Sequence, residues 1–317
     1  MDPPRTITVT AMSRPHLFRQ MLESLVANDL DGWTVLVRVE PGPRAAEFAP
    51  IAAELLRGVD CDLRVNSERR GITVNPFLTL EEAFARGSHL NLYLEEDFLV
   101  SPDATRLALW YARQRRDHWL CLSLLAGPCG SAGLLSNPAH PDLLFEARTF
   151  NSIGFVLRRE EWLHHLRDVW LGRDGRAGGI HANWRYNWGW DWSVYGLLAS
   201  NPELRGVQPV LARATHNGRE GGIYALPAFH DAAFGGLPIN DTPAPAYRVV
   251  EVAELPRDVR AHVVLQDELT TMRMQMEQVA VGDAEGQSTM LTTSLPRSTP
   301  LGRPADGGFW SRLRRRP

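Results

Sequence analysis

Strand-like apolar runs alternate with segments of helical spacing over the first hundred residues, and this alternation limits the folds that the chain can adopt. Runs rich in β-branched and apolar residues predict strands at 6–11, 33–40, 61–66 and 89–97. Between them, apolar residues recur at helical spacing in 16–26, 45–56 and 74–87. The sequence therefore predicts an α/β fold of Rossmann-like type, in which a mostly parallel sheet is flanked by helices on both faces.

The remainder of the chain is less regular. Helices are expected from 104 to about 116 and at 257–280, a buried strand at 118–127, and a strand followed by a helix at 150–170. Residues after 283 are rich in Ser, Thr, Pro and Gly, which predicts a disordered C-terminal tail. We accordingly expect four parts: 1–126, 127–248, a C-terminal helical extension at 249–282, and the tail at 283–317.

The composition is that of an ordinary globular protein, and it excludes some partners. A net charge of -3 over 317 residues argues against a general nucleic-acid-binding protein, which would usually be basic. The cysteines Cys61, Cys121 and Cys129 are too few and too scattered for a disulfide framework, and they suit a reducing compartment. No apolar run reaches the ~18 residues that a membrane span needs, and the opening residues lead directly into a strand. We expect no signal peptide, no transmembrane segment and a cytoplasmic location.

Three consecutive acids, Glu95, Glu96 and Asp97, stand at the end of the fourth predicted strand. Carboxylates packed this closely repel one another, and burying them without partners is unfavourable. A divalent cation would relieve the repulsion, and hard oxygen ligands suit Mg²⁺ or Mn²⁺ held jointly with substrate phosphates. The alternative, given equal weight, is a solvated strand end whose acids face water or pair with arginines.

A second candidate lies in a tryptophan-rich segment, 184–196, where four tryptophans surround Asp191. A carboxylate in aromatic surroundings is desolvated, which raises its pKa and makes it a better general base. Flat aromatic faces also stack on sugar rings, so this composition suits a carbohydrate ligand. Alternatively, the tryptophans fill the core and Asp191 caps the helix that follows it.

Two smaller features complete the set. His216, followed by a glycine-rich turn, is a candidate ligand for a metal or a contact to phosphate, although a lone loop histidine is more often a surface residue. The basic end of the chain, 312–317, is a candidate contact with a membrane or a partner. The chain has no GxxxxGK[ST] or GxGxxG turn, so the P-loop and dinucleotide-binding folds lack their fingerprints.

These motifs occur in an order that resembles the GT-A glycosyltransferases, in particular the inverting N-acetylglucosaminyltransferase I-like group, which uses UDP-sugars. The most specific match is LYLEEDFLVSPD, which is similar to the E-D-D-x-x-x-x-P-D segment of that group. The other segments that resemble the group are TVTAMSRPHLFRQMLESL, VLVRVEPG, FNSIGFVLRREEW, GWDWS and PVLARATHNGREGG. Together they span roughly residues 5–225.

The resemblance implies a role for each matching residue. Asp97 would coordinate Mn²⁺ or Mg²⁺ at the donor diphosphate, with Glu95 and His216 as further metal ligands and Glu96 at the donor. Arg14 and Glu40 would contact the nucleoside. Asp191 would be the general base that deprotonates the acceptor hydroxyl, and the sugar-stacking residues would be Trp188, Trp190 and Trp192. Residues 1–126 would then bind the nucleotide-sugar, and residues 127–248 the acceptor.

The sequence departs from the group in three places. Glu96 is the middle acid of the metal motif, Trp190 precedes the proposed base where an acid is usual, and the membrane anchor of the eukaryotic members is missing. The donor sugar, the nucleotide and the acceptor therefore stay open. Two alternatives remain: a catalytically silent carbohydrate-binding protein on the same fold, and a nucleotidyltransferase, although the first turn, AMSRPH, is not the glycine-rich basic turn expected for a triphosphate.

Overall fold

A computed structural model describes residues 3–127, 135–170, 190–220 and 227–284, apart from the side chains of residues 192, 199–200, 270–271 and 273–284. The contacts within the chain define one unit, Met1–Gln278, and a second, Val279–Pro317. The tail expected at 283–317 lies almost wholly outside the described residues. Residues of the two expected parts 1–126 and 127–248 share a single sheet in the first unit.

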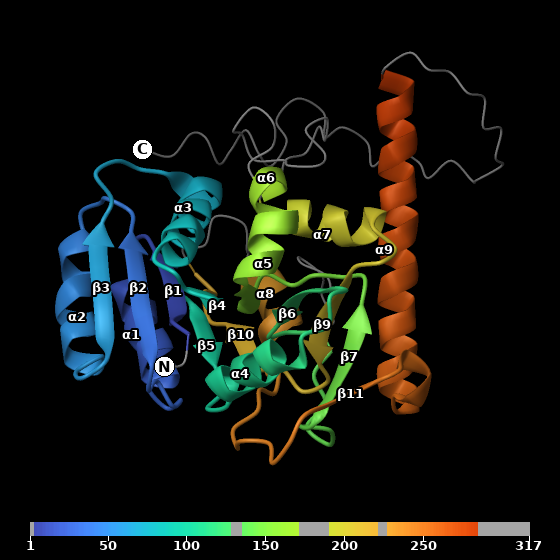
Figure 1. Ribbon diagram of the computed structural model, residues 1–317, viewed down its shortest axis with the longest axis horizontal. Helices are drawn as coiled ribbons and strands as arrows, with labels where there is room; N and C mark the ends of the chain where they lie inside the picture. Colours follow the sequence, from blue (N-terminus) through green and yellow to red (C-terminus); the bar gives the residue numbers. More distant parts are fainter. Residues whose placement is uncertain (1–2, 128–134, 171–189, 221–226, 285–317) are drawn as a thin grey trace. The chain divides into compact units, whose positions relative to one another are not determined.

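The sheet has nine strands in the order β11-β7-β9-β6-β8-β4-β1-β2-β3, which Figure 1 shows edge to edge across the first unit. Parallel pairings outnumber antiparallel ones: β8 runs against both of its neighbours, β7 runs against β9, and β11 is parallel to β7. The expected α/β fold with a mostly parallel sheet is therefore confirmed. The strands are β1 (Arg5–Ala11), β2 (Trp33–Val39), β3 (Asp60–Val65), β4 (Leu90–Glu95), β6 (Trp119–Ser123), β7 (Leu143–Ala147), β8 (Phe155–Arg158), β9 (Arg205–Pro209) and β11 (Arg248–Val250).

Helices cover both faces of the sheet, as the alternating pattern predicts. One face carries α1 (Pro15–Leu25), α2 (Phe48–Leu55) and α4 (Ala104–Gln114), and the other carries α3 (Gly71–Ala85), α5 to α6 (159–170) and α7 (Asp191–Ser200). Strand β4 serves both cores, because Leu92 and Leu94 point to the first and Tyr93 to the second. A strand buried on both faces needs a continuous apolar run, and residues 92–94 provide it.

The second face is built largely from aromatic rings. Trp170 and Trp190 stack with their ring centroids 4.3 Å apart and their planes within 7°. Trp162, directly after α5, Tyr93 of β4 and Phe155 of β8 continue this packing. The large buried area of these rings stabilises the face by the hydrophobic effect and fixes the start of α7 against the sheet.

Three smaller elements complete the first unit. A short antiparallel pair, β5 (Phe98–Val100) and β10 (Ala214–His216), lies directly after β4, and α8 (Pro227–Phe234) follows β10. The long helix α9 (Arg257–Ala284) packs beside β7 through Val259 and Val263 (Figure 1). None of the helices in the described ranges has the length and apolar character needed to cross a membrane.

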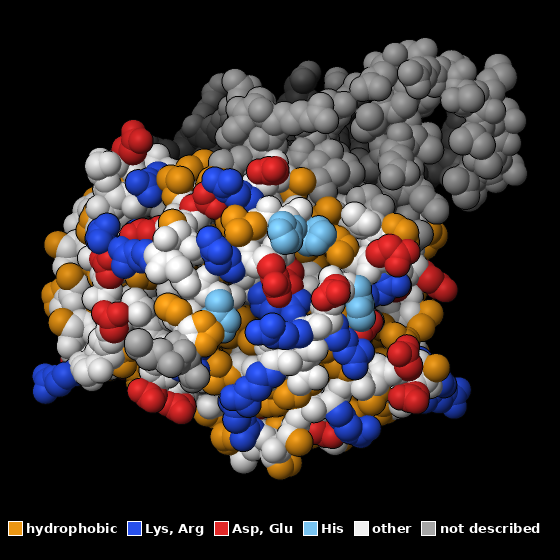
Figure 2. Space-filling view, in the orientation of Figure 1, with side chains coloured by type: hydrophobic (Ala, Val, Ile, Leu, Met, Phe, Trp, Pro, Cys, Tyr) orange, Lys and Arg blue, Asp and Glu red, His pale blue; other side chains and the backbone are white. Residues whose placement is uncertain are grey.

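The surface carries charges of both signs. Figure 2 shows positive and negative side chains interspersed over the face in view. Many of them form exposed pairs, such as Arg19 with Glu54 and Arg44 with Glu47. This mixture accords with the small net charge of the chain.

Several expectations from the sequence need correction at the level of single elements. Arg14 is the N-cap residue of α1 and makes no side-chain capping bond; the carboxylate of Glu96 binds the amides of this turn instead. The helix expected at 45–56 begins as a 3₁₀ turn (Ala45–Glu47) before α2. The strands β7, β9 and β10 were not predicted, since each is short and is flanked by irregular sequence.

A buried ion pair ties the β10 segment to the start of α4. Arg213 Nε lies 2.9 Å from Asp103 Oδ1, and both side chains are fully buried. Tyr247 and Ser101 donate hydrogen bonds to the same carboxylate, at 2.7 Å each, and Arg213 also donates to the carbonyl oxygens of Leu211 and Pro141. The carboxylate thus has its hydrogen-bonding capacity filled, as burial of a charge requires.

We expect Arg213→Met to lower the free energy of unfolding by about 3–5 kcal/mol, because it leaves the Asp103 charge buried without its partner. Denaturant unfolding followed by circular dichroism would measure this loss. The matched control is Arg19→Met, which breaks an exposed pair and should leave stability unchanged within error. Similar losses in the two variants would contradict the importance assigned to the buried pair.

Candidate active site

The site forms where the parallel strands β1, β2 and β4 end at the same edge of the sheet. Thr10 of β1 is in register with Glu95 of β4, and Ala11 with Val39 of β2. The residues that follow these strands are therefore brought together in space although they lie far apart in the sequence. This is the edge at which open α/β sheets bind their ligands.

Glu96 organises the loop that follows β1. Its Oε2 accepts hydrogen bonds from the backbone amides of Met12, Ser13 and Arg14 at 2.7, 3.2 and 3.4 Å. Its Oε1 accepts a hydrogen bond from Arg14 Nε at 2.8 Å. A buried carboxylate at the N-terminal end of α1 also interacts favourably with the helix dipole. Glu96 thus fixes the loop and the side chain of Arg14 together.

Asp97 lies between the side chains of Arg14 and His216. Its Oδ2 accepts a hydrogen bond from Arg14 Nη2 at 2.7 Å and lies 3.0 Å from His216 Nε2. Burial opposes ionisation of Asp97, but the hydrogen bond from His216 and the charges of His216 and Arg14 outweigh it and hold the pKa of Asp97 below its usual value. Asp97 is therefore a carboxylate at neutral pH.

The small β5–β10 pair delivers His216 to this position. His216 is in register with Phe98, and the Asn217 amide donates to the Asp97 carbonyl oxygen at 2.7 Å, which extends the ladder by one bond. The Gly218 amide donates to His216 Nδ1 at 3.2 Å. The ring nitrogen of His216 that faces Asp97 is Nε2.

One donor and one acceptor of this cluster have no hydrogen-bond partner among the described residues. They are Asp97 Oδ1 and Arg14 Nη1, and both atoms are buried. The backbone of Gly218 passes beside them: a Cβ at this position would lie 2.4 Å from Asp97 Oδ2 and 2.7 Å from Arg14 Nη1. Buried polar groups are rarely left unpaired, so these two atoms are candidates for contact with an ordered water or a ligand.

Glu95 differs from its two acidic neighbours. Its Oε1 accepts a hydrogen bond from Tyr93 at 2.9 Å, and the Tyr93 hydroxyl also bonds the Thr10 hydroxyl at 2.8 Å. Desolvation is the main cause that raises the pKa of Glu95 to about 8, followed by the negative charges of Asp97 and Asp191. Glu95 and Asp97 thus differ in the direction of their pKa shifts, because Arg14 and His216 bind Asp97 directly, whereas Glu95 is hydrogen-bonded by Tyr93.

Asp191 begins α7 on the far side of Glu95, and its charge contributes to the pKa of Glu95. Its carboxylate lies in the first turn of the helix, where a negative charge is favourable, but Trp190 occupies the N-cap position. Asp191 is partly exposed. Asp191 therefore lies close enough to the acidic site for its charge to act on Glu95.

The tryptophans expected to stack on a sugar are placed differently. Trp190 is only 2% exposed and packs against Trp170, Tyr93, Phe150 and Phe155, so it fills the core and has no free face for a sugar. For Trp190 the core alternative is correct, since a ring enclosed by four others is stabilised by burial. Trp188 and the side chain of Trp192 lie outside the described residues.

The two residues expected at the nucleoside also have other partners. Glu40 accepts hydrogen bonds from the amides of Arg70 and Gly71 at 2.9 and 3.0 Å, so both of its oxygens fix the start of α3. Arg14 pairs with the acids after β4. The charge repulsion that suggested a metal is thus relieved within the chain by Arg14 and His216.

The expected metal ligands are only partly assembled. Asp97 and His216 are in contact, but within the described ranges no three His, Cys, Asp or Glu side chains converge as a metal cluster, so Glu95 does not join them. A hard divalent cation nevertheless needs few protein ligands, because it keeps waters and binds substrate phosphates. The unpaired, buried oxygen of Asp97 fits such a cation, and an imidazole beside it suits Mn²⁺.

Some residues of the site were not predicted. Gly218 follows His216 in a turn that was noted only for its glycines, and Tyr93 was assigned to a strand without a further role. A glycine two residues after a candidate ligand was the available signal for Gly218. The contact between Tyr93 and Glu95 joins residues on one face of β4, two positions apart, and the alternation of side chains along a strand could have indicated it.

Comparisons with known proteins add a list of similar structures. No protein-family model matches the chain, and no curated protein sequence matches it. Among solved structures, the mannosyltransferase PcManGT from Pyrobaculum calidifontis, in complex with GDP-Man and Mn²⁺, is 14% identical with a TM-score of 0.40; the match covers 93% of this chain and 77% of that one. S. aureus TarS 1–349 is 10% identical with a TM-score of 0.44, covering 92% and 76%. TarS in complex with UDP is 9% identical with a TM-score of 0.43, covering 90% and 72%. At this level of similarity the matches identify neither the family nor the reaction of this chain.

We expect Gly218→Ala to lower the free energy of unfolding by about 1–3 kcal/mol, because the added methyl group must displace Asp97, Arg14 or His216. Denaturant unfolding followed by circular dichroism would measure the loss. Gly42→Ala is the matched control, since nothing lies within 4 Å of the methyl group that it adds. Equal stabilities of Gly218→Ala and the unmodified chain would show that the cluster around Asp97 accommodates a side chain at this position.

Proposed function

We propose that the chain is a metal-dependent GT-A glycosyltransferase that moves a sugar from a nucleotide-diphosphate donor, UDP-sugar favoured, to a hydroxyl of a glycan or other acceptor. The observation that supports this most directly is the pair of buried, unpartnered atoms, Asp97 Oδ1 and Arg14 Nη1. A diphosphate with a divalent cation offers a positive centre to the first and phosphate oxygens to the second.

Asp97 and His216 would hold the cation, Mn²⁺ or Mg²⁺. When bound, it would stabilise the negative charge that develops on the leaving diphosphate as the sugar–oxygen bond breaks. Arg14 would also stabilise this negative charge. Glu96 fixes the orientation of its guanidinium, and Nη1 has no partner among the described residues. A preorganised donor of this kind needs little rearrangement during the reaction, which is the basis of electrostatic catalysis.

Asp191 is our candidate for the general base. It stands at the start of α7, partly exposed, and its charge acts on Glu95 in the acidic site. A carboxylate placed opposite the leaving group would accept the proton of the acceptor hydroxyl as that oxygen attacks the anomeric carbon. One base and direct displacement imply inversion at that carbon, and the proton and the diphosphate leave on opposite sides of the sugar.

The first expected outcome concerns donor binding. A UDP- or GDP-sugar at about 100 times its dissociation constant, with Mn²⁺, should stabilise the protein by ~2.7 kcal/mol, seen as a higher melting temperature. Asp97→Asn should lose the part of this shift that depends on Mn²⁺, because the amide has no charge to offer the cation. Asp168→Asn, an exposed acid on α6, should keep the whole shift. A Mn²⁺-dependent shift that is undiminished in Asp97→Asn would show that the cation is held elsewhere.

The second expected outcome concerns the base. Asp191→Asn should reduce kcat by about 10²- to 10⁴-fold, since general base catalysis contributes this much, while donor binding stays close to that of the unmodified chain. Steady-state kinetics with the donor identified by the binding screen would measure both. Proton NMR of the first product formed should show the inverted anomeric configuration. Transfer at the full rate by Asp191→Asn, or a retained configuration, would refute this mechanism.

A further inference from the structure

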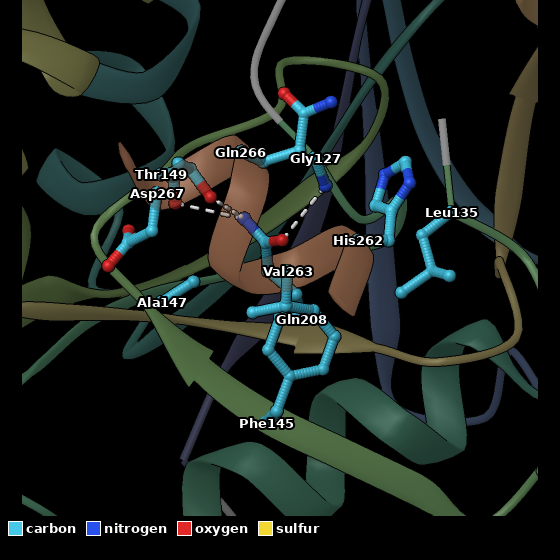
Figure 3. Close-up of a pocket in the computed structure, with 10 residues that line it drawn as sticks. All are labelled: Gly127, Leu135, Phe145, Ala147, Thr149, Gln208, His262, Val263, Gln266 and Asp267. Atoms are coloured by element: carbon cyan, nitrogen blue, oxygen red, sulfur yellow. Dashed lines mark hydrogen bonds between the residues drawn. The ribbon is translucent and has the colours of Figure 1, made fainter. Parts of the chain in front are cut away.

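Helix α9 has two apolar faces, and one of them packs against the sheet among the residues that the structure describes. Val259 and Val263 are buried against the sheet near Phe145. Figure 3 shows this docked face, where His262, Val263 and Gln266 of α9 lie beside Gln208 and Thr149 around a small cavity. Its volume of about 10 Å³ is room for roughly one water molecule. This side of the helix therefore has its partner.

The opposite side of α9 is apolar and exposed. Leu265, Leu269 and Met272 are 52%, 47% and 51% exposed. At 3.6 residues per turn these positions lie roughly half a turn around the helix from Val263. Half of the large hydrophobic residues that are exposed among the described side chains belong to α9: Val264, Leu265, Leu269 and Met272. Such a concentration on a surface that is otherwise well charged marks an interaction site.

The spacing of these residues specifies the kind of partner. Positions 265, 269, 272 and 276 are Leu, Leu, Met and Met, and Val279 continues the alternation of four- and three-residue steps along the same helix. This is the a/d pattern of a left-handed coiled coil, with a at 269 and 276 and d at 265, 272 and 279. A seam of this period fits against another helix with the same period.

The charges beside the seam indicate what that second helix is. In this register Glu268 is at g and the residue at the following e position, 273, is Arg. Two copies of α9 in parallel orientation place Glu268 of one copy next to Arg273 of the other, twice over by symmetry. In antiparallel orientation the same positions would oppose glutamate to glutamate and arginine to arginine. The helix is thus complementary to a parallel copy of itself.

We propose that α9 joins this chain to a second copy through a parallel, in-register coiled coil along positions 265 to 279. The open groove of about 400 Å³ between α9 and Glu146, Ala147 and Val252 flanks the seam at Met272 and leaves room for the side chains of the partner helix. This inference is independent of the proposed reaction, since α9 contributes none of the site residues named above.

Light scattering coupled to size exclusion, on the full chain over about a hundredfold range of concentration, tests the association. We expect a mass that rises to twice that of the chain, and monomer throughout for Leu269→Glu, which places charges in the seam. Leu163→Glu is the matched control, because it changes a leucine that is also exposed, at 40%, on another helical segment. Circular dichroism should confirm that both variants fold. A monomeric unmodified chain at every concentration would overturn the proposal.

Cross-linking and charge exchange test the parallel register. Leu265→Cys and Met276→Cys, made separately, should each form an interchain disulfide when dissolved oxygen oxidises the two thiols, whereas Thr271→Cys, off the seam, should not. These two seam positions lie ~16 Å apart along the helix, so an antiparallel pair cannot cross-link both. Glu268→Arg should weaken association about three- to tenfold, and Arg273→Glu in the same chain should restore it. Cross-linking at one seam position alone, or no restoration, would refute the parallel register.

Discussion

The contact between Arg14 and the adjacent acids Glu96 and Asp97 is the interaction on which the site depends. It joins the loop after β1 to the end of β4, two strands that are neighbours in the sheet but lie more than 80 residues apart in the chain. Glu96 also binds three amides at the start of α1, so the same carboxylate sets the direction in which that helix leaves the sheet. Without Arg14, two adjacent buried carboxylates would repel each other and one would take up a proton.

A second tie brings in a segment from much later in the chain. The β5–β10 ladder and the buried pair of Asp103 with Arg213 flank Asp97 on its C-terminal side, and together they fix the approach of His216 and Gly218. Both ties depend on residues directly after β4. The residues after β4 thus hold two parts of the site: the loop after β1, which carries Arg14, and the β10 segment, which carries His216.

Helices and strands with a regular apolar spacing could be predicted from the sequence. Contacts between side chains that lie far apart in the chain could not. The strands β1 to β4 and the helices α1 to α4 were predicted because each has several apolar residues at one period. The acids at the end of β4 were predicted as a candidate site because three charges interrupt an apolar run. The sequence analysis predicted that Arg14 contacts the nucleoside and that Trp190 stacks on a sugar. Sequence spacing could not show that Arg14 pairs with Asp97 or that Trp190 stacks on Trp170. Short strands such as β7 and β10 have too few residues to display a period.

The state of charge of the site explains why a cation and a diphosphate are proposed together. A ligand with only negative charge would pair with Arg14 Nη1 but would add its charge to that of Asp97. A cation alone would satisfy Asp97 Oδ1 but would face the guanidinium of Arg14, which already binds the same carboxylate. A cation bound to a diphosphate avoids both conflicts, because each part of the ligand neutralises the group that the other part would repel. The internal pairing of Arg14, Glu96 and Asp97 therefore selects for a ligand that carries both charges at once.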